Sequence, residues 1–241
     1  MPAYTQYFEY GDTEINWLKS RDTILGSAID EIGHISRPVT PDLFEALIHS
    51  IVSQQISAAA LVTVWARIKG RINPFTPDKI VALPVEELQH CGISMRKAGY
   101  IKAAAHAVAN GELDLDALHK MSDSEVCKKL AEIKGIGVWT AEMLMTFSMQ
   151  RPNILSWDDL AIHRGLRMLY RHRKITPALF AKYKRRYSPY GTVASLYLWS
   201  IASGACPAMT DPGQRKIKKI RIPNEKGKTH QTRRDVSFTA E

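Results

Sequence analysis

The chain has 241 residues, of which 45% are hydrophobic, so it can bury a core, and general disorder is excluded. Its formal net charge is +9, and nine Lys and Arg against three acidic residues lie in segment 213–241. This charge favours a polyanionic partner such as nucleic acid, whereas the lack of any apolar run of about 18 residues predicts that the chain is not embedded in a membrane.

From Pro41 to Arg171 the apolar residues recur at helical spacing, and alternation typical of strands is nearly absent. The first apolar stripe comprises Leu43, Phe44, Leu47, Ile48, Ile51 and Val52. The pattern therefore predicts an all-α fold. Typical helix lengths of roughly 11 residues predict about eight to ten short helices.

Local signals mark several helix ends. Thr76 precedes a proline, which predicts a capped helix start, and Ser122 and Glu125 have the spacing of a capping box. Gly111 follows an asparagine and predicts a helix end. Beyond residue 212 the apolar periodicity stops, so residues 213–241 are predicted to form a flexible basic tail that either contacts phosphates or is simply solvated.

Residues 130–145 predict two helices joined by a tight turn that contains Gly135 and Gly137. We expect the second helix to begin near Val138, so that free backbone N–H groups point outward at the positive end of the helix dipole. A DNA phosphate fits there, and Gly135, Gly137, Val138 and Thr140 are the expected DNA-binding residues. The Gly-x-Gly spacing alone is more typical of an ordinary helix–helix turn.

The wider context of this turn is more specific. The motif Leu-x-x-x-x-Gly-Ile-Gly-x-x-Thr-Ala, followed by Asp-x-x-Ile-x-Arg at 159–164, resembles the helix-hairpin-helix and Gly/Pro-Asp signature of base-excision DNA glycosylases. The resemblance covers residues 42–206 and is closest to the 3-methyladenine DNA glycosylase II branch. Further matching segments are 53–57, 92–98 and 189–199.

The resemblance implies a two-lobed helical fold with a central DNA-binding cleft. We expect residues 41–150 to form one lobe that ends in the hairpin. Residues 1–40 and 151–212 would form the second lobe, which carries the catalytic aspartate. The expected partner is double-stranded DNA containing damaged bases, bound by a monomer.

Hydrolysis of an N-glycosidic bond builds positive charge on the sugar, so the site needs a carboxylate beside the anomeric carbon. The family pattern selects Asp159 as that catalytic group and leaves Asp158 as the expected N-cap of the next helix. The alternative for Asp159 is that it merely caps this helix. His163 and Arg164 would orient the carboxylate or contact the DNA backbone.

Two aromatic residues are expected to line the base pocket. Bifunctional members of the superfamily carry a lysine two residues after the second hairpin glycine, where this chain has Trp139. Because an indole cannot form a Schiff base, strand cleavage is not expected. The resemblance places Trp139 and Tyr190 against the base, where stacking favours a cationic alkylpurine by roughly 0.5–2 kcal/mol. Core packing is the alternative for both rings.

Extrusion of a base leaves a gap that a side chain must fill. The resemblance selects Met95 as this wedge, with core packing as the alternative. Arg96 and Lys97 would hold phosphates or be solvated. Gln54 is predicted to reach the partner base or to cap the turn after its helix.

The remaining features concern cofactors and location. Cys91, Cys127 and Cys206 are far apart and have no Cys-x-x-Cys spacing, so we expect no metal, iron–sulfur cluster or other cofactor. The first residues lack the pattern of a secretory leader, which predicts a cytoplasmic, nucleoid-associated protein. A glycosylase for deaminated or oxidised bases, and a non-catalytic DNA-binding module, remain as alternative functions.

Overall fold

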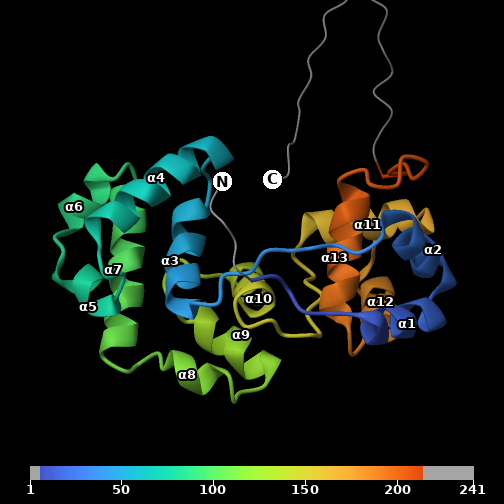
Figure 1. Cartoon of the computed structure of the whole chain (residues 1–241), viewed down its shortest axis with the longest axis horizontal. Coiled ribbons are helices and arrows are strands. Elements are labelled where there is room, and N and C mark those ends of the chain that lie inside the picture. The colour runs from blue at the N-terminus through green and yellow to red at the C-terminus, as the bar shows by residue number, and fades with distance from the viewer. Residues whose placement is uncertain (1–5, 214–241) are drawn as a thin grey trace, which may run out of the picture.

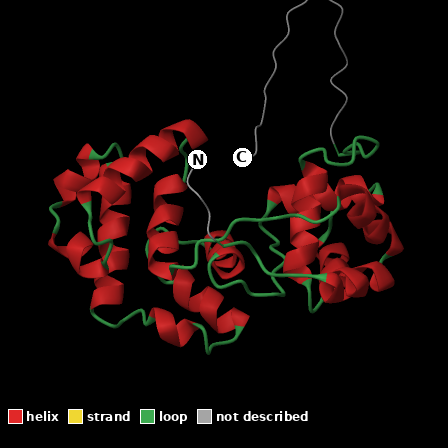
Figure 2. Cartoon of the chain, viewed as in Figure 1, coloured by secondary structure: helices red, strands yellow, loops and turns green. Residues whose placement is uncertain are grey.

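The computed structural model describes residues 6–213, which form 13 helices and no strand (Figure 2). The predicted all-α class is confirmed. The predicted number of about eight to ten helices is too low, because the short helices α5, α6 and α8, of 6, 6 and 4 residues, were not counted separately. The basic tail predicted for 213–241 lies, except for its first residue, outside the described residues.

The helices, in chain order, are α1 (Asp12–Arg21), α2 (Thr23–Ile32), α3 (Leu43–Ser53), α4 (Ala58–Arg71), α5 (Pro77–Ala82), α6 (Val85–His90), α7 (Met95–Ala109), α8 (Leu115–Leu118), α9 (Asp123–Ala131), α10 (Val138–Phe147), α11 (Leu160–Tyr170), α12 (Pro177–Tyr187) and α13 (Gly191–Ala202). None of them is long and apolar enough to cross a bilayer.

The predicted helix ends are present. The Thr76 hydroxyl accepts a hydrogen bond from the third residue of α5, and Ser122 and Glu125 form a reciprocal capping box at the start of α9. Helix α7 ends at Ala109 with Asn110 as its C-cap, followed by Gly111 with φ +74°. These local signals therefore fix the helix boundaries that separate α5, α7 and α9 from their neighbours.

The buried side chains form two separate clusters. The first draws on α3 to α10 and ends at Ile154, and the second draws on the segment before α1, on α1 and α2, and on the chain from Leu155 to Cys206. In Figure 1 the helices of the two clusters occupy opposite halves of the molecule, with α10 between them. The site discussed next lies where the chain passes from one cluster to the other.

Two contacts fix how the halves meet. The Thr40 N–H donates to the Phe147 carbonyl at the end of α10 (2.9 Å), and the Phe147 ring lies 5.5 Å from the Trp199 ring of α13. Within the second half, α11 packs closely on α13, because a Cβ at Gly165 would lie 2.3 Å from the Leu198 carbonyl oxygen. This packing holds α11 against α13.

Candidate active site

The two glycines of the hairpin between α9 and α10 have different structural roles. Gly135 has φ +93°, and a Cβ there would lie 2.5 Å from the Tyr100 ring. Gly137 is the N-cap of α10 with φ −94°, and a Cβ there would meet nothing within 4 Å. Gly135 is therefore required by the fold. Gly137 instead leaves the N-terminus of α10 open to a partner.

The residues after Gly137 face in different directions. Gly137 and Val138 are exposed, Val138 by 48%, whereas the Thr140 side chain is only 8% exposed. The Thr140 side chain is therefore buried, and a contact of this residue with DNA stays a prediction, as do the DNA contacts of Gly135, Gly137 and Val138.

The Asp159 carboxylate is held by two N–H donors. Its Oδ1 accepts from the Ile162 backbone N–H (2.8 Å), and its Oδ2 accepts from the Trp139 indole Nε1–H (3.0 Å). Asp159 is thus itself the N-cap of α11, with extended backbone angles, and the predicted N-cap role of Asp158 is wrong. Its residue exposure is 6%, and the described ion pairs do not include it.

The structure brings Trp139 and Asp159 together but gives Tyr190 a different neighbour. Trp139 is 45% exposed, so much of its ring remains free while its N–H is bound to the carboxylate. The Tyr190 ring packs edge-on against Trp17 of α1, with centroids 6.3 Å apart. Its place as a second wall of a base pocket stays a prediction.

At the start of α7, Met95 and Arg96 face solvent, whereas Lys97 is hydrogen-bonded to the backbone of another helix. Met95 is 47% exposed and Arg96 is exposed, so core packing of Met95 is contradicted, whereas its wedge role stays a prediction. Lys97 neither faces phosphate nor is freely solvated. Its ammonium donates to the carbonyls of Val52 (2.7 Å) and Gln54 at the end of α3.

Gln54 connects α3 to the hairpin. Its side-chain amide donates to the Gly135 carbonyl (2.8 Å). This bond ties the end of α3 to the hairpin between α9 and α10, so Gln54 has a structural role. Contact with the partner base stays a prediction.

His163 does not orient Asp159. Its Nε2 lies 2.7 Å from the Trp157 carbonyl oxygen, and its ring packs against the rings of Trp157 and Phe180, with centroids 4.7 and 5.5 Å away. The imidazole thus supports the segment that precedes Asp159. The Nε of Arg164 is buried and has no hydrogen-bond partner among the described residues.

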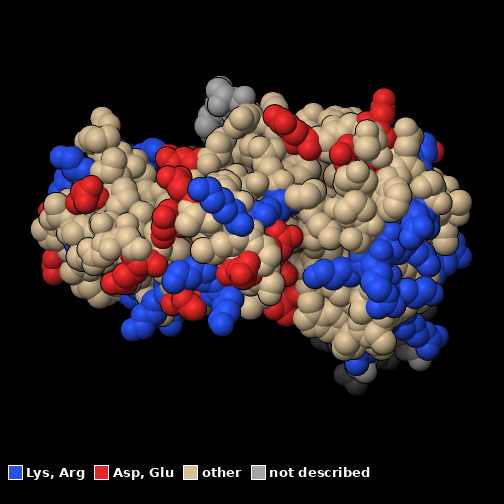
Figure 3. All heavy atoms as spheres, turned by 90° about the horizontal axis from the view of Figure 1, so that it is seen from below, with Lys and Arg blue, Asp and Glu red and all other residues tan. Residues whose placement is uncertain are grey.

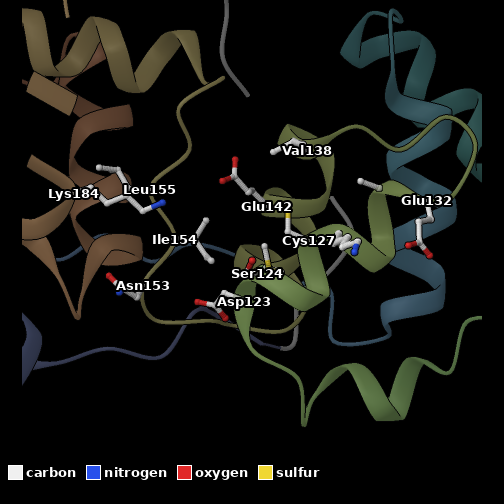
Figure 4. Close-up of a pocket in the computed structure, with 13 residues that line it drawn as sticks. Asp123, Ser124, Cys127, Glu132, Val138, Glu142, Asn153, Ile154, Leu155 and Lys184 are labelled. Atoms are coloured by element: carbon white, nitrogen blue, oxygen red, sulfur yellow. The ribbon is translucent and has the colours of Figure 1, made fainter. Parts of the chain in front are cut away.

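Sequence reasoning missed three residues of the region between the halves. Trp157, two positions before Asp159, is 41% exposed. Glu142 of α10 and Lys184 of α12 line a cavity of about 750 Å³ together with α9 and residues 153–155 (Figure 4). The sequence could have singled out Glu142, because it is the one charged residue in the otherwise uncharged segment that forms α10.

The charges near this cavity are mixed. Burial raises the pKa of Glu142; the Ser156 hydroxyl and Lys184 act in the opposite direction, and the carboxylates of Asp158 and Asp159 raise it further. No group of three or more His, Cys, Asp or Glu that could hold a metal ion occurs within residues 6–213.

Basic side chains gather on one part of the surface. Figure 3 shows Lys and Arg concentrated over the half of the molecule that contains α11 to α13. The last turn of α12 supplies Lys184, Arg185 and Arg186, of which Arg186 is paired with Asp22 (2.5 Å). Such a surface suits a polyanion.

A helical hairpin with an open helix N-terminus, next to a carboxylate between two helical halves, defines the architecture of a helix-hairpin-helix DNA repair enzyme. Residues 48–189 match the HhH-GPD superfamily of base excision DNA repair proteins, and the chain belongs to this superfamily. The resemblance inferred from the sequence is thereby confirmed.

Individual relatives agree with the family match. DNA-3-methyladenine glycosylase 1 of Schizosaccharomyces pombe is 35% identical over 164 residues, which cover 66% of this chain and 72% of the relative. The solved structure of a DNA-3-methyladenine glycosidase from Bacillus halodurans has 33% identity and a TM-score of 0.77, covering 85% of this chain and 96% of that one. A Schizosaccharomyces pombe 3-methyladenine DNA glycosylase solved with abasic DNA has 30% identity and a TM-score of 0.68, covering 79% and 97%.

Proposed function

We propose that the protein is a monofunctional DNA glycosylase that extrudes an alkylated purine, 3-methyladenine or 7-methylguanine, from duplex DNA and hydrolyses its N-glycosidic bond. The observation that carries the proposal is the hydrogen bond from the exposed Trp139 indole to the buried Asp159 carboxylate at the start of α11. The names of the relatives support the same reaction and substrate class.

In this reaction the bond between the base nitrogen and the sugar C1′ breaks, and the base leaves with the bonding electrons. Asp159 stabilises the positive charge that develops on the sugar. The oxygen of a water molecule then bonds to C1′, and the water gives up one proton to the solvent, which leaves a hydroxyl group on the sugar. An alkylated purine is already cationic or electron-poor, so it leaves readily. Because position 139 holds an indole and not an amine, the product is an intact strand with an abasic site.

The remaining parts of the proposal concern DNA binding. The lobes are residues 41–150 and residues 1–40 with 151–212, and the cleft between them receives the duplex. The open N-terminus of α10 binds a phosphate, Met95 fills the gap in the base stack, and Arg96 contacts the backbone. The enzyme acts as a monomer in the cytoplasm, at the nucleoid.

The test compares two neighbouring substitutions that remove the same charge. Asp159→Asn keeps a side chain that can cap α11, and we expect it to slow single-turnover release of 7-methylguanine by at least about 100-fold while binding to abasic DNA is retained. Asp158→Asn, the matched control, should stay within about threefold of the wild type. Wild-type release by Asp159→Asn would remove this carboxylate from the mechanism.

A further inference from the structure

The segment that contains α12 carries a high density of positive charge. Residues 171–186 hold seven Lys and Arg and no Asp or Glu. Arg186 is paired with Asp22, whereas the other six are exposed and belong to no ion pair among the described residues: Arg171, Arg173, Lys174, Lys182, Lys184 and Arg185. Like charges this close repel one another, so the segment favours a polyanionic partner.

Two of these side chains lie on the outer face of α12. Phe180, Tyr183 and Tyr187 are buried and mark the inner face of the helix. Lys182 and Arg185 are exposed and three residues apart, so they are neighbours on the opposite face. The helix therefore presents a pair of positive charges to solvent, on the half of the molecule where Figure 3 shows Lys and Arg gathered.

The same helix adjoins the candidate active site. The Phe180 ring packs edge-on against the ring of Trp157, with centroids 5.1 Å apart, and Trp157 lies two residues before Asp159. Nearer the end of α12, Lys184 lines the same cavity as Val138, the first residue of α10 (Figure 4). Helix α12 is thus next to both the segment that carries Asp159 and the open N-terminus of α10.

A DNA duplex that contacts the N-terminus of α10 presents further phosphates on either side of that contact. Duplex DNA carries one phosphate charge per about 1.7 Å of its axis, so basic side chains beside the first contact have phosphates to bind. Lys184 is near Glu142, and the two charges offset each other in part. Lys182 and Arg185, which belong to no described ion pair, therefore offer the stronger attraction for phosphate.

We propose that the outer face of α12, through Lys182 and Arg185, is a second DNA-binding surface that holds phosphates of the duplex outside the lesion. Its contacts are electrostatic and read neither sequence nor damage. The inference rests on the proposed function only for its partner, duplex DNA. The surface adds affinity and takes no part in breaking the glycosidic bond.

The experiment measures binding of the full chain to an undamaged duplex of about 25 base pairs over a salt series. The double substitution Lys182→Gln with Arg185→Gln removes two phosphate contacts, each of which contributes about 0.9 to the slope of log Kd against log salt concentration. We expect the slope to fall by about 2 and binding at about 0.1 M salt to weaken at least about tenfold.

Two controls separate charge at this surface from charge in general. Lys79→Gln with Lys120→Gln removes two exposed lysines of the first half that belong to no described ion pair, and it should change the slope by less than about 0.5. Lys182→Arg with Arg185→Lys keeps both charges and should bind within about twofold of the wild type. Urea unfolding checks that all three variants remain as stable as the wild type, and Lys182→Gln alone should lose about half of the slope change.

The outcomes are decisive for the surface. A wild-type salt slope in the Lys182→Gln, Arg185→Gln variant would overturn the inference. An equal loss of affinity on a duplex of about 9 base pairs would place these contacts within the lesion site and would also overturn it. Single-turnover base release at saturating protein should stay within about twofold of the wild type, and a larger loss would make α12 part of the chemical step.

These measurements are independent of the proposed function, because binding is measured on undamaged DNA. A wild type that releases no base from any lesion but shows the expected salt slopes would contradict the glycosylase activity and support the second surface. An active wild type with an unchanged slope in the double variant would do the reverse.

Discussion

At the scale of single residues, Trp139 has a role that the sequence did not suggest. The resemblance predicted a ring for base stacking, a role that requires only an exposed face. The structure adds that the indole N–H orients the Asp159 carboxylate (3.0 Å). This contact joins residues 20 positions apart and depends on how α10 meets α11, so residue spacing could not reveal it.

Trp139→Phe tests this positioning role, because it keeps an aromatic ring but removes the donor. Loss of a hydrogen bond to a charged group costs about 1.5–3 kcal/mol, so we expect single-turnover base release to slow by roughly tenfold or more. Binding to abasic DNA should change less than the rate. A rate equal to or above that of the wild type would show that the indole N–H does not assist Asp159.

At the scale of elements, the sequence predicted the helices that begin or end with strong local signals. The capping box of α9, the proline start of α5 and the start of α10 were all found in the structure. The short helices α5, α6 and α8, of 6, 6 and 4 residues, were not counted separately, because so few turns give little periodicity. The N-cap of α11 was misplaced by one residue because two adjacent aspartates offer the same chemistry.

The two hairpin glycines give a matched pair of substitutions. Gly135→Ala combines a positive φ with a contact on the Tyr100 ring, so we expect a loss of roughly 2–4 kcal/mol in the free energy of unfolding. Gly137→Ala has ordinary backbone angles and open space, so its loss should stay below about 1 kcal/mol.

For DNA binding we expect the opposite order: Gly137→Ala should be affected, although its stability is nearly unchanged. The Gly137→Ala methyl group would project where a phosphate approaches α10, so we expect abasic DNA to bind about tenfold more weakly at unchanged stability. Urea unfolding and a binding titration at fixed salt measure the two effects. Wild-type affinity in Gly137→Ala would indicate that DNA does not approach this helix end.

At the scale of the whole molecule, the chain after α13 is tied back to α11 within the second half. Arg167 of α11 makes two hydrogen bonds to the Asp211 carboxylate (2.8 and 2.6 Å), and the Gly213 N–H donates to the same group (2.9 Å). The sequence marked this region only as the point where apolar periodicity ends. Ion pairs between distant segments have no local signature, so this contact could not be predicted.

This contact predicts a specific dependence of stability on pH. The Arg167 guanidinium holds the pKa of Asp211 below its ordinary value of 3.8, so the stabilisation is complete above about pH 4–5 and is lost as the pH falls through the lowered pKa. Asp211→Asn should therefore lower the free energy of unfolding by about 1.5–3 kcal/mol at pH 7. The difference from the wild type should shrink towards pH 2. A difference that is constant over this range would contradict the assignment.

The central claim is that the protein hydrolyses the N-glycosidic bond of alkylated purines. It is tested most directly by incubating the protein, without added metal, with duplexes containing 7-methylguanine, 3-methyladenine, uracil or 8-oxoguanine, and by measuring free base and strand breaks before and after alkali. We predict release of the alkylpurines, with strand breaks only after alkali. Binding to these duplexes without release of any base would contradict the claim and leave a non-catalytic DNA-binding module.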